Sequence, residues 1–214
     1  MNEKVRSGNL IIVSGPSGAG KSVLASRVLQ EMPHLKFSVS YTTRAPRGAE
    51  QNGVEYFFVN REEFQALIQG NDLLEWAEYY GNYYGTSRAF VDGLLRQGED
   101  VLLDIDIQGA SIVRQKRPDA VGIFILPPSF QILRDRLMRR SLDAGFVIEQ
   151  RLKIARREIR HYNDYDYLII NEEINSSTLE LQSIILGARC RTAARRERAE
   201  SVIATFGGID AEDP

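Results

Sequence analysis

The stretch GPSGAGKS, residues 15–22, stands between an apolar run and an amphipathic segment. The preceding run, NLIIVS, is typical of a strand that is buried on both faces of a parallel sheet. After the stretch, Leu24, Val28 and Met32 recur at four-residue steps until a proline ends the pattern, which predicts a helix. The stretch itself matches the spacing G-x-x-x-x-G-K-[ST]. Strand, glycine-rich loop and helix together predict a P-loop that opens an α/β fold.

Each part of this loop suits it to hold phosphate. Glycines let backbone N–H groups turn toward an anion at the positive end of the following helix. Lys21 adds a charge for the outer phosphates, and Ser22 offers a hydroxyl to Mg²⁺. The predicted ATP-binding residues are Gly15, Pro16, Ser17, Gly18, Ala19, Gly20, Lys21 and Ser22. Because switches, motors and kinases all use such loops, the acceptor of the phosphoryl group has to be sought elsewhere in the chain.

Composition narrows the class of protein. A chain of 214 residues with 43% hydrophobic content is enough for one domain with a sizeable core. The formal net charge of −2 gives no overall attraction to nucleic acid or to an anionic membrane, so neither partner is expected. The single cysteine excludes an internal disulfide, and no secretion signal or membrane-spanning run is visible. These features favour a cytoplasmic enzyme.

The rest of the chain alternates between strands and helices, with one exception. Apolar runs such as VLLDIDI, AVGIFIL and YLII are separated by stretches of helical periodicity, which predicts a parallel sheet flanked by helices. The segment from about 37 to 87 differs, because it holds short β-like pieces between turns and one brief helical stretch. We expect this segment to be an insert.

The insert carries side chains that suit a nucleotide. Arg44 and Arg47 can each present a planar fork to phosphate, and Tyr56 supplies a hydroxyl nearby in sequence, which together suit a phosphate monoester. Glu75 lies in a mainly apolar strand. One carboxylate can accept both the ring N–H and the amine of guanine, while a hydroxyl such as Ser40 donates to O6. Adenine offers neither arrangement, so the insert favours guanine.

Five stretches together resemble the guanylate kinase family, the ATP:GMP phosphotransferases: GPSGAGKS, SVSYTTRAPR, NGVEYFFV, LLEWAEYYGNYYGTS and DIDIQG. The resemblance runs from about residue 10 to residue 186. It implies a P-loop NTPase-type parallel sheet with a small β-rich GMP-binding insert and a helical lid. It also implies transfer of the γ-phosphoryl group of ATP to GMP or dGMP in purine nucleotide metabolism, with Mg²⁺ as cofactor. It leaves the oligomeric state open.

The resemblance also implies roles for single residues. The guanine contacts would be Ser40, Glu75 and Thr86, and the GMP phosphate would be held by Arg44, Arg47, Tyr56 and Tyr84. Asp104 and Asp106 would lie at a strand end near Mg²⁺ and the GMP, with Ser22 on the metal and Asp104 reaching it through water. A helix cap or a solvated turn is the alternative for this acidic pair.

A second set of arginines lies where the family has its lid. Arg136 and Arg140 share a helix face at four-residue spacing, and Arg151 begins the next helix. Closed over ATP, such arginines would stabilise the transferred group; a salt-bridged solvent face is the alternative. The expected catalytic residues are Lys21, Arg44, Arg136, Arg140 and Arg151. The lid tip, Ser141–Phe146, departs from the short polar tip of relatives, and Asn171 is expected on the adenine side.

The implied organisation is one domain over residues 1–214. Its parts are a core of about 8–36, 88–135 and 155–190, the insert at about 37–87, the lid at about 136–154, and a basic helix and tail at about 190–214. The basic helix lacks the interleaved aromatic residues of a nucleic-acid surface, so we expect a solvated helix face.

Two other functions fit parts of the pattern. A non-catalytic binding module of the same fold would not need the intact Gly20, Lys21 and Ser22. A P-loop kinase of a sugar phosphate would keep that loop but have no use for Ser40, Glu75 and Thr86 together. Turnover with GMP separates both alternatives from a guanylate kinase.

Overall fold

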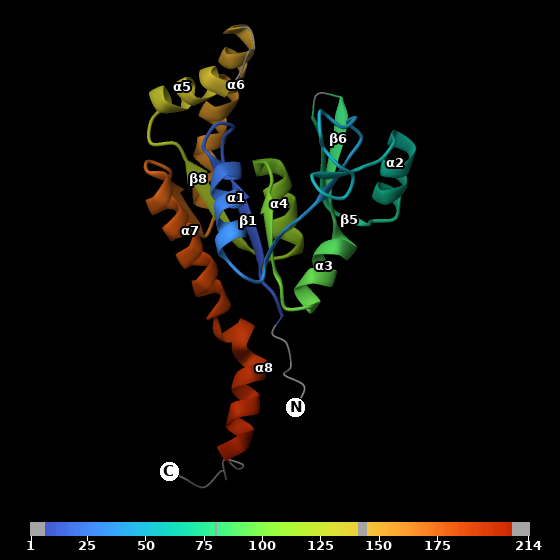
Figure 1. Cartoon of the computed structure of the whole chain (residues 1–214), viewed down its shortest axis with the longest axis vertical. Helices are drawn as coiled ribbons and strands as arrows, with labels where there is room; N and C mark the ends of the chain where they lie inside the picture. Colours follow the sequence, from blue (N-terminus) through green and yellow to red (C-terminus); the bar gives the residue numbers. More distant parts are fainter. Residues whose placement is uncertain (1–6, 80, 141–144, 207–214) are drawn as a thin grey trace.

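The computed structural model describes residues 7–79, 81–140 and 145–206, and its central layer is a five-stranded parallel sheet (Figure 1). The strand order is β2-β7-β1-β8-β9, and every pairing is parallel. The strands are β1 (Leu10–Ser14), β2 (Leu35–Phe37), β7 (Asp100–Asp104), β8 (Val121–Leu126) and β9 (Tyr167–Ile170). Parallel strands end at the same edge of a sheet, so β1 delivers the P-loop to the edge at which β7 ends.

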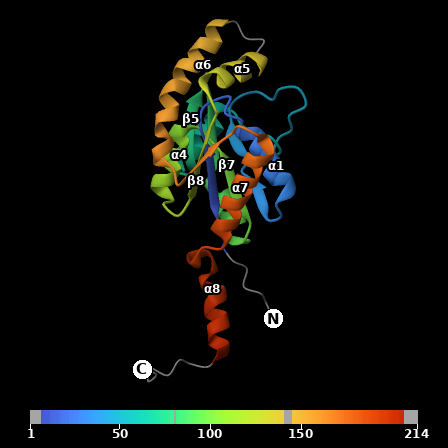
Figure 2. The same cartoon turned by 90° about the vertical axis from the view of Figure 1, so that its left-hand side faces the viewer.

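Helices cover both faces of this sheet. One face carries α1 (Lys21–Glu31) and α7 (Ile174–Arg189), which lie toward the viewer in Figure 2, and the other carries α3 (Arg88–Arg96) and α4 (Ile107–Lys116). Alternate residues of β1 serve the two sides: Ile11 belongs to the core under α1 and α7, and Ile12 to the core under α3 and α4. The predicted doubly covered parallel sheet is confirmed.

A second sheet forms the part of the chain that departs from strand–helix alternation. Its order is β4-β3-β6-β5, with β6 antiparallel to both β3 and β5. The elements are β3 (Ser40–Thr42), β4 (Tyr56–Phe58), α2 (Arg61–Gln69), β5 (Leu73–Tyr79) and β6 (Asn82–Ser87). The ammonium of Lys116 on α4 donates a 2.7 Å hydrogen bond to the Leu74 carbonyl, which fastens the small sheet to the core.

Two helices above the P-loop form a lid with a small core of its own. They are α5 (Phe130–Arg140) and α6 (Gly145–Glu158), and a 3₁₀ turn, η1 (Ile159–Asp164), follows. Leu133 and Leu137 of α5 are buried against Leu152 of α6. A Cβ at Gly18 would lie 2.9 Å from Leu133, so the lid rests on the P-loop. Residues 141–144 of the expected lid tip lie outside the described residues.

The C-terminal helix projects from the body. It comprises α8 (Thr192–Ile203) and the short η2 (Ala204–Phe206), and both views show it extending beyond the end of α7 (Figures 1 and 2). It has no buried residue, as expected of a solvated helix. Among the described residues, no helix combines the length and the apolar character that crossing a membrane requires.

Candidate active site

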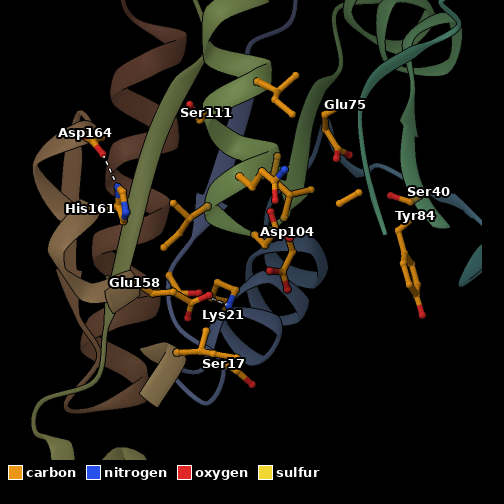
Figure 3. Close-up of a pocket in the computed structure, with 18 of the residues that line it drawn as sticks. Ser17, Lys21, Ser40, Glu75, Tyr84, Asp104, Ser111, Glu158, His161 and Asp164 are labelled. Atoms are coloured by element: carbon orange, nitrogen blue, oxygen red, sulfur yellow. Dashed lines mark hydrogen bonds and ion pairs between the residues drawn. The ribbon is translucent and has the colours of Figure 1, made fainter. Parts of the chain in front are cut away.

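An open cavity of about 1330 Å³ lies where the central sheet, the small sheet and the lid meet (Figure 3). The P-loop forms one end of it and the small sheet the other, while the end of β7 and the start of α4 lie between them. The lining includes Lys21, Ser22, Ser40, Tyr56, Glu75, Tyr84, Asp104, Asp106, Arg151 and Glu158. Segments that are far apart in the sequence therefore face one space.

The P-loop is held from two sides. The Lys21 ammonium donates to the carbonyl oxygens of Gly15 at 2.7 Å and Pro16 at 3.3 Å. The buried Asn171 amide donates to the Ala19 carbonyl at 2.8 Å. Gly20 has a φ of +101°, which favours glycine, and a Cβ there would collide with the Asn171 amide. Asn171 thus fixes the loop's shape, a structural contact that sequence reasoning did not assign to it.

The two aspartates at the end of β7, Asp104 within the strand and Asp106 after it, have different partners. The Ser22 hydroxyl donates to the Asp104 carboxylate at 2.9 Å, so a hydroxyl and a carboxylate meet beside the P-loop. Asp106 instead accepts the Gly109 N–H at 2.7 Å and caps α4, which is the capping role that the sequence left open. Oxygen donors of this kind suit Mg²⁺, which is usually held by one or two carboxylates together with substrate phosphates. No group of three or more His, Cys, Asp or Glu side chains that could hold a metal occurs among the described residues.

Ser40, Thr86 and Glu75 form a row across three neighbouring strands. Ser40 pairs with Thr86 in the β3–β6 register, and Thr86 pairs with Glu75 in the β6–β5 register. The Thr86 hydroxyl donates to the Glu75 carboxylate at 2.5 Å, and both side chains are buried. Burial raises the pKa of Glu75 to about 7, against the lowering effect of the Thr86 hydrogen bond. The structure thus brings together the three residues expected at guanine.

Helix α4 supports this row from behind, through a residue that sequence reasoning missed. A Cβ at Gly109 would lie 3.0 Å from Oε2 of Glu75. A side chain at this position would therefore press on the carboxylate. The available signal was the glycine within the first turn of a helix in DIDIQG, where glycine is otherwise unfavourable.

The two arginines of the insert, Arg44 and Arg47, have different side-chain partners and exposure. Arg44 donates two parallel hydrogen bonds of 2.9 Å to Glu50, which also accepts the Arg47 backbone N–H at 2.7 Å. The Glu50 hydrogen bonds are the main cause that raises the pKa of Arg44, and Tyr84 adds to the rise. The Arg44 guanidinium also lies 5.4 Å from the Tyr56 ring centroid. The Arg47 side chain is exposed, and neither Arg44 nor Arg47 is among the residues that line the two cavities.

Sequence reasoning missed Glu50. The signal for it was weak: an acidic residue three positions after Arg47, in a segment without helical or strand periodicity. Its two oxygens accept from Nη1 and Nη2 of Arg44, so Glu50 orients the guanidinium.

The lid arginines are also separated. Arg136 donates to the carbonyl oxygens of Ala19 at 3.3 Å and Asn171 at 3.0 Å. It lines a second cavity of about 570 Å³ that shares Gly18 and Gly20 with the large one and also contains Arg139, Asn171 and Glu172. Arg151 lines the large cavity, and the Arg140 side chain lies outside the described residues. In this conformation, Arg136 and Arg151 therefore do not share one cavity.

Comparisons with a family model, with curated relatives and with solved structures all point to the same family. The family model described as guanylate kinase matches residues 7–188. The guanylate kinase of Koribacter versatilis is 48% identical over 198 residues, which cover 91% of this chain and 85% of that protein. The guanylate kinase of Shewanella violacea is 53% identical over 183 residues, which cover 85% of this chain and 88% of that protein. The crystal structure of guanylate kinase from Anaplasma phagocytophilum matches with a TM-score of 0.73 and 35% identity, covering 93% of this chain and 97% of that one.

Proposed function

Because this chain belongs to the guanylate kinase family and transfers the γ-phosphoryl group of ATP to GMP, we propose that its two substrates occupy the two ends of the large cavity. The observation that carries the proposal is continuity: one space of about 1330 Å³ joins Lys21 on the P-loop to the buried carboxylate of Glu75. ATP phosphates bound to the loop and a guanine bound to Glu75 would then direct the GMP phosphate toward the γ-phosphorus.

At the guanine end, the ionised Glu75 carboxylate would accept the ring N1–H and the exocyclic amine of the base. The Thr86 hydrogen bond of 2.5 Å fixes the carboxylate, and Ser40 would donate to O6. Adenine presents an acceptor at N1, which would face the carboxylate and leave it unpaired, so AMP would be rejected. None of these contacts uses the ribose 2′-hydroxyl, and we expect dGMP to be a second acceptor.

At the acceptor phosphate, Arg44, Tyr56 and Tyr84 would form the binding cluster. Tyr56 and Tyr84 lie edge to face with ring centroids 6.0 Å apart, next to the Arg44 guanidinium. Arg47 would join them by turning its exposed side chain inward. Phosphate would then lie beside two guanidinium groups, whose positive charges suit a dianion.

At the donor end, Ser22 and Asp104 would hold Mg²⁺, and Lys21 would contact the outer phosphates of ATP. The metal, when bound, neutralises charge on the β- and γ-phosphates. An anionic oxygen of GMP attacks the γ-phosphorus in line and ADP leaves, so no side-chain nucleophile is needed. Arg151, with Arg136 and Arg140 after lid closure, would stabilise the transferred group. The adenine would lie in the second cavity beside Asn171.

The test is ADP release with ATP against GMP, dGMP, AMP, CMP, UMP, a ribose phosphate and no acceptor, with and without Mg²⁺. We expect Mg²⁺-dependent turnover with GMP and dGMP alone. Glu75→Gln should lose most of its preference for GMP over AMP, whereas Glu62→Gln, an exposed carboxylate on α2, should keep it. Unchanged preference in Glu75→Gln would remove this residue from the base site.

A further inference from the structure

One more carboxylate faces the phosphate end of the cavity, and the reaction described above does not use it. Glu158 is the last residue of α6 and lines the cavity together with Ser17 and Lys21. Figure 3 shows its side chain directed toward Lys21. Burial raises the pKa of Glu158, whereas the Lys21 charge and the Ser17 backbone N–H favour its ionised form. Glu158 therefore interacts with two parts of the P-loop.

These two partners are groups that hold phosphate in a P-loop. Backbone N–H groups of the loop and the ammonium of its lysine bind phosphate oxygens because they combine donors with positive charge. A carboxylate oxygen on the same groups is a negatively charged substitute. Once a triphosphate is bound there, the carboxylate and the phosphates would repel each other at short range.

The position of Glu158 on α6 gives this repulsion a mechanical consequence. Arg151 lies seven residues earlier on the same helix, which places it on the same face about 10 Å along the axis, and both residues line the cavity. One face of α6 thus presents a negative charge to the P-loop and carries a positive charge two turns away. A shift of α6 that removes Glu158 would also move Arg151.

We propose that Glu158 occupies the P-loop as a counter-charge in the empty enzyme, and that the outer phosphates of ATP displace it and thereby shift the lid helix. This inference rests on the proposed binding of ATP phosphates at residues 15–22. Glu158 is therefore a positioning residue. It sets the position of α6 before ATP binds, and it lowers the affinity for ATP because the phosphates must displace it.

The first measurement is the dissociation constant for Mg·ATP and, in a separate titration, for GMP, by calorimetry on the whole chain. Glu158→Gln keeps the shape and an acceptor for the Ser17 N–H but removes the charge. We expect it to bind ATP roughly tenfold more tightly and GMP as the wild type does. The matched control is Glu149→Gln on the same helix, whose side chain is 68% exposed and should leave both constants unchanged.

The second measurement is hydrogen exchange in the last turn of α6. In the wild type, ATP should change exchange there; in Glu158→Gln the empty enzyme should already resemble the ATP-bound wild type. Unchanged or weaker ATP binding in Glu158→Gln, or exchange like that of the empty wild type, would overturn the proposal. Lys21→Ala tests the donor site separately from Glu158: if this variant still binds ATP normally, the proposed donor site itself is wrong.

Discussion

Replacing Gly109 by alanine should damage guanine recognition without weakening the fold. The new Cβ would lie 3.0 Å from Oε2 of Glu75 and 3.4 Å from the Glu75 carboxyl carbon and from an Asp106 oxygen. Such contacts are short, so the Glu75 carboxylate must give way by a few tenths of an ångström. It has little room to do so, because Thr86 holds its other oxygen at 2.5 Å.

The magnitude follows from the hydrogen bonds at stake. A hydrogen bond to a charged group contributes about 1.5–3 kcal/mol, and 1.4 kcal/mol corresponds to a tenfold change in affinity. Loss of one of the two guanine contacts should therefore raise the KM for GMP by roughly 10- to 100-fold. Alanine is also favoured over glycine inside a helix by up to about 1 kcal/mol, so the melting temperature should not fall.

The assay is steady-state kinetics with each substrate varied in turn, together with thermal unfolding. Gly109→Ala should raise the KM for GMP while the KM for ATP and the melting temperature hold. Gly93→Ala on α3 is the matched control, because a Cβ there meets nothing within 4 Å. If Gly109→Ala binds GMP as tightly as the wild type, Glu75 either tolerates displacement or does not contact the base, and the proposed role of Gly109 is refuted.

Three further predictions concern charge. Lys21→Ala should lower kcat by about 10³, as loss of a charge at the transferred group does; near-normal turnover would contradict its role. GMP binds the ionised form of Glu75, whose pKa burial raises to about 7, so the dissociation constant for GMP should rise by up to about tenfold per pH unit below 7 and level off above it. In Glu75→Gln this slope should vanish, and a slope that persists would point to another group. Glu50→Gln should raise the KM for GMP more than it lowers kcat, because Arg44 loses the carboxylate that orients it; equal effects on both constants would argue against a positioning role.

The central fold could be predicted because local pattern and tertiary environment agree there. A strand covered on both faces must be apolar throughout, and the run from Leu10 to Val13 meets this condition. The row of Ser40, Thr86 and Glu75 is different, because it depends on strand register across 46 residues of chain. The residues could be named by resemblance, but their adjacency and the raised pKa of Glu75 follow only from the pairing and the burial.

Other features could not be predicted because their cause is local geometry. Trp76 lies in a mainly apolar run, which is typical of a buried position, yet it is 41% exposed. A β-bulge between Leu73 and Glu75 shifts the alternation, so that Leu74 and Glu75 are both buried and Trp76 turns outward. In the same way, spacing groups Arg136 with the other lid arginines, whereas its hydrogen bonds to Ala19 and Asn171 place it on the second cavity.

Helix α4 limits how the base specificity of this enzyme could be changed. Its first turn is capped by Asp106, its glycine at position 109 leaves room for Glu75, and Lys116 at its far end ties it to the small sheet. A variant with only Glu75 exchanged would keep a helix whose glycine leaves room for a carboxylate. A smaller side chain at position 75 would leave a cavity beside Gly109. The base preference thus depends on β5 and α4 together, and a redesign has to change both elements.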